Sequence, residues 1–191
     1  MFTARQNACY MGLALLTLGF DASAVGVGVA VMNDRSLSSV PVGSTALLLP
    51  IRVTNHLSIE PFFTFKSFDN TEADGSTFEV STMELGVGVF MRSPTSSNVS
   101  NYFGARISKI SSTVNFETIQ SGPGADDEYD ATIITPLVGF DYMGFEVMTL
   151  GIEFGLSILD GSFTDGNNAN NNSDLKMQAL HSAIVVRYFS K

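Results

Sequence analysis

Apolar and polar residues alternate along most of this chain with a period of two. Residues 25–32 read Val-Gly-Val-Gly-Val-Ala-Val-Met, so valines fall at one parity and Gly, Gly, Ala and Met at the other. Successive side chains of a β-strand point to opposite faces, so the pattern predicts strands with one aliphatic and aromatic face. The other face carries glycines, hydroxyls and single charges. No helical period of comparable length competes with this alternation.

Eight such segments are separated by Gly, Asn, Asp and Ser residues, which favour turns. Their connections alternate between short and long, which is typical of an antiparallel up-and-down barrel, although the connection at 93–101 is longer than the pattern predicts. The predicted fold class is therefore all-β, an eight-stranded antiparallel up-and-down β-barrel. The expected strands are 25–33, 45–54, 57–68, 78–92, 102–114, 129–142, 145–159 and 175–189.

The first 24 residues predict a cleaved signal peptide. Arg5 precedes an apolar run over 11–20, and Ala22-Ser23-Ala24 forms a small-residue cleavage site. The run is about half of the roughly 20 residues that a membrane-spanning helix needs. We expect a signal peptide over 1–24 and one domain over 25–191. The only cysteine, Cys9, lies in the leader, so the mature chain would contain no thiol.

Composition favours a barrel whose apolar face points outward. Charged residues make up 15% of the chain, against roughly 25% in soluble domains, and the mean hydropathy is +0.20. Bulky Phe, Leu and Ile residues are too numerous for the lumen of eight strands, whereas glycines suit a narrow lumen. Together with the export signal, these features predict a transmembrane barrel with an apolar exterior and a polar lumen.

The polar face carries charges on most of the expected strands. A charge buried in the lumen without a partner costs several kcal/mol, so these acids and bases must pair. We expect a buried ion-pair network that plugs the lumen, with a structural role in preference to ion gating or conduction. Its expected members are Glu60, Lys66, Glu84, Arg106, Asp141, Glu153 and Arg187.

Five segments resemble the small eight-stranded outer-membrane barrels of the OmpA, OmpX and OmpW kinds. They are Leu57-Ser-Ile-Glu-Pro-Phe-Phe63, Tyr102-Phe-Gly-Ala-Arg106, Thr135-Pro-Leu-Val-Gly-Phe-Asp141, Leu150-Gly-Ile-Glu-Phe-Gly-Leu156 and Val186-Arg-Tyr-Phe189. The resemblance covers the whole expected mature chain. It implies a transmembrane barrel in the outer membrane of a Gram-negative cell envelope, in contact with lipid and lipopolysaccharide. Because Trp is absent, an aromatic girdle would depend on Tyr102, Tyr142, Tyr188 and the 15 Phe.

Candidate catalytic and metal-ligating residues are sparse. The two histidines, His56 and His181, cannot supply a multi-histidine metal site. His181 and Ser182 invite comparison with membrane-embedded lipid A deacylases, but neighbours on a strand point to opposite faces and cannot act as a pair. Ten basic against 19 acidic residues, a net charge of −9, argue against nucleic acid as a partner. We expect no catalytic residue, no cofactor and no metal.

The sequence thus predicts a non-enzymatic, porin-like outer-membrane protein with a structural, adhesion or surface-interaction role through extracellular loops. One alternative is a transport barrel resembling the OmpW kind, in which a small hydrophobic compound enters the lumen and leaves sideways. A continuous cavity past Glu60, Glu84 and Arg106 would favour transport, and a closed ion-pair layer would count against it. The other alternative is a secreted soluble ligand-binding β-barrel. An extracellular partner and the oligomeric state stay open.

Overall fold

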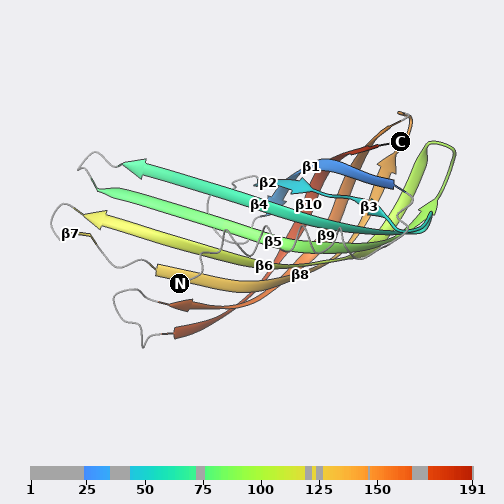
Figure 1. The fold of residues 1–191 in the computed structure, drawn as a ribbon. Helices are drawn as coiled ribbons and strands as arrows, with labels where there is room; N and C mark the ends of the chain where they lie inside the picture. Colours follow the sequence, from blue (N-terminus) through green and yellow to red (C-terminus); the bar gives the residue numbers. More distant parts are fainter. Residues whose placement is uncertain are drawn as a thin grey trace.

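The strands form one closed barrel (Figure 1). The computed structural model describes residues 24–34, 44–71, 76–118, 122–123, 127–145, 147–164 and 172–190. Every strand pairs antiparallel with its neighbours, and the last strand returns to pair with the first. The strands are β1 (Ala24–Asp34), β2 (Ser44–Leu48), β3 (Ile51–Arg52), β4 (Leu57–Thr71), β5 (Thr77–Pro94), β6 (Val99–Thr118), β7 (Gly122–Pro123), β8 (Asp127–Tyr142), β9 (Met148–Thr164) and β10 (Asn172–Phe189).

Strands β2 and β3 occupy a single position in the barrel wall. The register against β4 is the same on both sides of the gap between them, and Pro50 and Pro61 lie at this gap. Proline has no N–H, so it removes hydrogen bonds from the ladder. Leu49 N still donates to Pro61 O at 2.9 Å. Counting β2 and β3 together, and leaving aside the short β7 that pairs only with β6, the described residues form the predicted eight-stranded up-and-down barrel.

Several strand boundaries differ from those expected. The connection expected over 93–101 is a tight turn, because β5 continues to Pro94, β6 begins at Val99, and Thr95 N donates to Val99 O at 2.8 Å. The strand expected from 145 begins at Met148 and continues to Thr164. The short strand β7, which pairs with β6, was not predicted. Alternation identified the strands but not the points at which hydrogen bonding ends.

The two ends of the barrel differ in their connections. The tight connections 53–56, 95–98 and 143–147 lie at one end, which also holds the start of β1 and the end of β10. Three of the four connections at the other end are longer, and there β4, β5 and β6 extend well past β1 and β2 (Figure 1). Outer-membrane barrels have short periplasmic turns and longer outer loops. We therefore call the long-loop end the extracellular end.

Side chains alternate strictly between the inside and the outside of the wall. Along β8, buried and exposed residues alternate without a break from Glu128 to Tyr142. Outward apolar side chains cover about nine residues on each of three successive strands, at 134–142, 150–158 and 180–188. A transmembrane β-strand needs about 9–11 residues. This band of exposed aliphatic and aromatic side chains suits contact with hydrocarbon and would be an aggregation liability in water.

No helix in the described ranges is long and apolar enough to cross a membrane.

Candidate functional site

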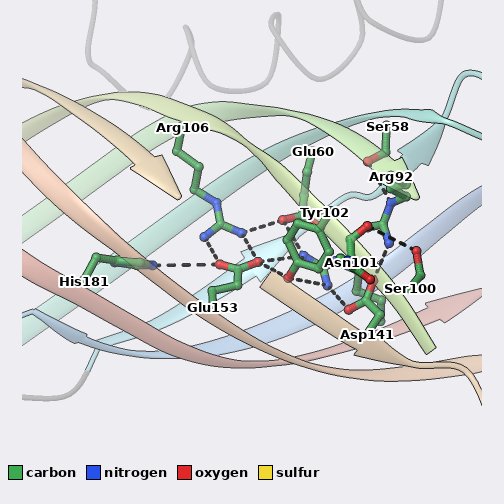
Figure 2. A network of polar contacts seen from close by, with 11 residues as sticks. Ser58, Glu60, Arg92, Ser100, Asn101, Tyr102, Arg106, Asp141, Glu153 and His181 are labelled. Atoms are coloured by element: carbon green, nitrogen blue, oxygen red, sulfur yellow. Dashed lines mark hydrogen bonds and ion pairs between the residues drawn. The ribbon is translucent and has the colours of Figure 1, made fainter. Parts of the chain in front are cut away.

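Charged side chains from six strands meet inside the barrel (Figure 2). All of them are buried; Arg92 is the most accessible, at 7% exposure. They all lie on the inward parity of their strands, which is why a wall with an apolar exterior can carry them. We call this group the ion-pair layer. Its members are Glu60 on β4, Arg92 on β5, Tyr102 and Arg106 on β6, Asp141 on β8, Glu153 on β9, and His181 and Arg187 on β10.

Arg187 joins three carboxylates at the centre of the layer. Its Nε donates to Glu60 Oε2 at 2.5 Å, and its Nη2 donates to Glu153 Oε1 at 2.8 Å. Its Nη1 donates to Asp141 Oδ1 at 2.9 Å. The guanidinium also lies 5.2 Å from the centre of the Tyr102 ring. One side chain on β10 therefore ties together strands β4, β8 and β9.

Arg106 forms a second bridge between Glu60 and Glu153. Its Nη2 donates to Glu60 Oε1 at 2.6 Å, and its Nη1 forms an ion pair with Glu153 Oε2. Tyr102 Oη donates to Glu153 Oε1 at 2.7 Å. Figure 2 shows the Glu153 carboxylate between Tyr102 and His181, whose Nε2 lies 3.8 Å from Glu153 Oε2. Glu153 is thus held by groups from β6 and β10.

Arg92 extends the layer toward the periplasmic turns. Its Nη1 forms an ion pair with Asp141 Oδ2, and its Nε donates to Ser58 Oγ at 3.0 Å. Its guanidinium carbon lies 4.9 Å from the centre of the Tyr102 ring. The Tyr102 ring therefore lies close to both the Arg92 and the Arg187 guanidinium groups, so cation–π attraction adds to the ion pairs.

The charges of the layer balance. Three guanidinium groups face three carboxylates, and each carboxylate accepts hydrogen bonds from at least two donors. Removing ions from water is expensive, and the attraction between them compensates only when geometry and hydrogen bonding are good. Removing a single partner leaves an uncompensated buried charge. The arrangement therefore demands that all six ionic members be present together.

Inward-facing glycines on neighbouring strands leave space for the side chains of the ion-pair layer. A Cβ at Gly139 on β8 would overlap the Tyr102 ring, and a Cβ at Gly151 on β9 would overlap Asp141 Oδ1. Both glycines lie on the inward parity. Any larger residue would have to displace a side chain that already holds several hydrogen bonds, so these positions need glycine for space.

The structure brings together five of the seven residues expected in the network. Glu60, Arg106, Asp141, Glu153 and Arg187 are in mutual contact. The other two, Glu84 and Lys66, share the inward parity but lie nearer the extracellular end and are only half-buried. Glu84 Oε1 accepts a hydrogen bond from Ser108 Oγ at 2.6 Å.

Sequence reasoning missed three members of the layer, although parity could have found them. Arg92 shares the inward parity of Glu84, and His181 shares that of Arg187. The assignment of Tyr102 to an outer aromatic girdle was wrong, because Tyr102 shares the parity of Arg106 and is 1% exposed in the lumen. Tyr142 and Tyr188 do face outward. His181 and Ser182 point to opposite faces, as expected.

The lumen on the extracellular side of the layer holds an apolar cluster beside polar residues such as Lys66 and Glu84. On β8 the inward residues Tyr129, Ala131 and Ile133 are buried together with Ile110 on β6 and Leu159 on β9. Leu175 and Met177 of β10 pack against them. We call this cluster the upper inner face, and it comprises Ile110, Tyr129, Ala131, Ile133, Leu159, Leu175 and Met177.

No protein-family model matches the chain, and no curated protein sequence matches it. Solved structures do. Neisserial surface protein A superposes with a TM-score of 0.56 and 17% identity, covering 86% of this chain and 96% of its own.

Two further structures have the same fold. Ail, the attachment invasion locus protein of Yersinia pestis, has a TM-score of 0.52 and 10% identity, over 87% of this chain and 97% of Ail. A major outer membrane protein from Thermus thermophilus has a TM-score of 0.53 and 11% identity, over 87% of this chain and 99% of its own. The fold of this chain is therefore that of these small outer-membrane β-barrels, and its apolar exterior is suited to insertion in a lipid bilayer.

Proposed function

We propose that this protein is a non-enzymatic outer-membrane barrel that acts through its extracellular end, as a surface-interaction or adhesion protein in contact with lipid and lipopolysaccharide. The observation that carries the proposal is the combination of an ion-pair layer across the lumen with strands that continue far beyond the apolar band. A barrel whose lumen is filled by side chains has its accessible chemistry on its outer surface.

The β4–β5 hairpin supports this proposal. Residues 67–71 of β4 are all exposed, although they remain paired with β5, so both faces of β4 lie in solvent there. Strand residues that bury neither face contribute little to the stability of the barrel. Polar and charged side chains such as Asp69 and its cross-strand partner Glu79 are there available to a partner outside the cell.

Two alternative functions, a secreted soluble barrel and a transport barrel, are less well supported. The apolar exterior argues against a secreted soluble barrel, because those side chains would face water. Transport along the lumen would need a continuous path past Glu60 and Arg106, and these two side chains are instead joined to each other and to Glu153. A closed ion-pair layer leaves no continuous cavity past these residues, so it argues against transport along the whole lumen.

The charge of the extracellular end indicates what kind of partner surface this protein would bind. The exposed ionic residues described there comprise six acids and two lysines, which are Asp69, Glu79, Glu128, Asp130, Asp160, Asp174, Lys109 and Lys176. Ail has been solved with the heparin analogue sucrose octasulfate, a polyanion. An acidic surface repels polyanions, so we propose a neutral or basic partner surface for this chain.

Adhesion of expressing bacteria tests the proposal. Cells of a Gram-negative host carrying the full chain, or an empty vector, are washed over wells coated with lysozyme as a basic protein, uncharged dextran or heparin. The expected result is retention above the vector level on lysozyme or dextran but not on heparin. Outer-membrane fractions run on gels with and without boiling verify that the barrel is inserted.

A charge-reversed hairpin and a matched control localise the effect. The double variant D69K/E79K reverses the exposed hairpin, and S96K/N98K places two lysines in an exposed periplasmic turn. Only D69K/E79K should shift retention toward heparin. Retention at the vector level on all three surfaces, with the barrel correctly inserted, would contradict an adhesive role.

A further inference from the structure

Strand β4 has one accessible edge at the extracellular end. The pairing between β2 and β4 ends at Thr64, whereas β4 continues to Thr71 and pairs there with β5 alone among the described strands. Figure 1 shows β4 as the outermost strand of the extension that β4, β5 and β6 form beyond β2. Residues 67–71 are all exposed, so their backbone is accessible to a partner. The edge of a strand is a template for pairing with another chain.

Pro61 shows which backbone groups lie along this edge. Its carbonyl oxygen accepts a hydrogen bond from Leu49 N at 2.9 Å, so residue 61 directs its carbonyl away from β5. Residues of an antiparallel strand direct these groups to alternate sides, and the register with β5 is continuous from residue 57 to residue 71. The odd residues Ser67, Asp69 and Thr71 therefore direct their N–H and C=O groups to the accessible edge. The residues between them bond to β5.

Two carboxylates lie opposite each other on the outward face beside this edge. Asp69 and Glu79 are cross-strand partners, both are exposed, and neither forms an ion pair with another described residue. Like charges directly opposite each other in a sheet are destabilising. A strand added beside β4 would place an outward side chain next to Asp69, and a Lys or Arg there would offset this repulsion.

The inward face of the same edge centres on Phe68, with Lys66 before it and Asn70 after it. Phe68 is 53% exposed and packs edge-on against Phe78, with ring centres 6.4 Å apart. Val80, the cross-strand partner of Phe68, is half-buried. An added strand would place an inward side chain next to Phe68, where an apolar side chain would cover the exposed ring and gain free energy from its burial.

We propose that the accessible edge of β4 binds an extended peptide segment of an extracellular protein, which adds to the sheet as a further strand beside residues 67–71. The segment alternates basic side chains, which lie outward next to Asp69, with apolar side chains, which lie inward next to Phe68. Main-chain hydrogen bonds give such a complex its affinity, and the alternate side chains give it specificity. The proposal rests on the proposed adhesive function and names the chemical class of its partner.

Binding of two peptides of opposite charge tests the proposal. The full chain in nanodiscs of zwitterionic phosphatidylcholine is titrated with fluorescent eight-residue peptides that alternate Lys with Val or Glu with Val. Fluorescence anisotropy reports binding relative to empty nanodiscs. We expect the Lys–Val peptide to bind about tenfold more tightly than the Glu–Val peptide. Equal affinities, or a Lys–Val signal no larger than in empty nanodiscs, would overturn the proposal.

A proline on the edge separates strand addition from attraction between charges. Ser67→Pro removes an N–H that points to the accessible edge and leaves Asp69, Glu79 and the β4–β5 ladder in place, because proline is tolerated where the N–H faces solvent. Ser67→Ala removes the hydroxyl but keeps the N–H. Ser67→Pro should weaken binding of the Lys–Val peptide about tenfold, and Ser67→Ala should change it by less than about twofold. Equal effects of the two variants, in barrels that keep the heat-dependent gel shift, would overturn strand addition.

The adhesion assay keeps this proposal apart from the adhesive function. If cells carrying the intact chain are retained on lysozyme or dextran but the chain does not bind the Lys–Val peptide, the adhesive function stands and strand addition at β4 is overturned. If the peptide binds with the expected charge preference and sensitivity to proline while no surface retains cells, the edge site stands and the adhesive function is contradicted.

Discussion

Replacing Arg187 by methionine measures how far the ion-pair layer stabilises the barrel. Arg187 is fully buried and donates to Glu60, Asp141 and Glu153. Without it, the layer holds three carboxylates and two guanidinium groups, so one negative charge is uncompensated. Removing one member of a buried ion pair costs about 3–5 kcal/mol. We expect a loss of this size in the free energy of unfolding, measured by urea titration of barrels refolded in phospholipid vesicles.

A matched control lies on the same strand. Lys176 of β10 forms an ion pair with Asp160 at 3.8 Å, and both side chains are more than two-thirds exposed. Exposed pairs contribute about 0–1 kcal/mol, so Lys176→Met should cost no more than that. Adding Glu60→Gln to Arg187→Met restores neutrality and should recover part of the loss. If Arg187→Met costs no more than Lys176→Met, the layer does not stabilise the barrel in the way argued.

Three further predictions concern space, the lipid-facing surface and the lumen. Gly139→Ala should destabilise the barrel by about 1–3 kcal/mol through overlap with the Tyr102 ring, whereas outward Thr132→Ala should stay within about 0.5 kcal/mol in the same urea titration. Val138→Arg, in the middle of the outward band on β8, should cost about 2–4 kcal/mol in vesicles, and Asp130→Arg near the extracellular end should cost much less; equal costs would mean that Val138 does not face lipid. Planar bilayers with the intact chain should show no unitary conductance steps in potassium chloride, and regular steps would mean that the layer is open.

The strands and the outward direction of their apolar faces could be predicted because period-two alternation is a local property. Residues 83–89 of β5, for example, alternate between Met, Leu and Val and the smaller or charged residues that face inward. Alternation cannot give a position along the barrel axis. Lys66 lies six residues beyond Glu60 on β4, which is about 20 Å along a strand, so the two cannot belong to one compact layer.

The apolar upper inner face could not be predicted from alternation alone. On β8 the apolar residues change parity along the strand, because Tyr129, Ala131 and Ile133 face inward whereas Ile134, Val138 and Phe140 face outward. Period-two alternation separates the two faces of a strand but does not show which of them points into the lumen. Only the register with Ile110 on β6 and Leu159 on β9 shows that they form one surface.

The central claim is that the apolar side chains on one parity of each strand face lipid. The side chains on the other parity face the lumen, where they form the ion-pair layer and the upper inner face. Cys9 is the only cysteine, so single cysteines can be placed one at a time at residues 132–138 and 140 of β8 in a Cys9→Ser chain and labelled with a nitroxide in vesicles. The measurement is the collision rate of each label with oxygen, which concentrates in lipid, and with a water-soluble nickel chelate. We predict high oxygen accessibility at the even positions 134, 138 and 140 and low accessibility at the odd positions 133, 135 and 137. Oxygen accessibility that is highest at the odd positions, or that does not alternate, would contradict the account.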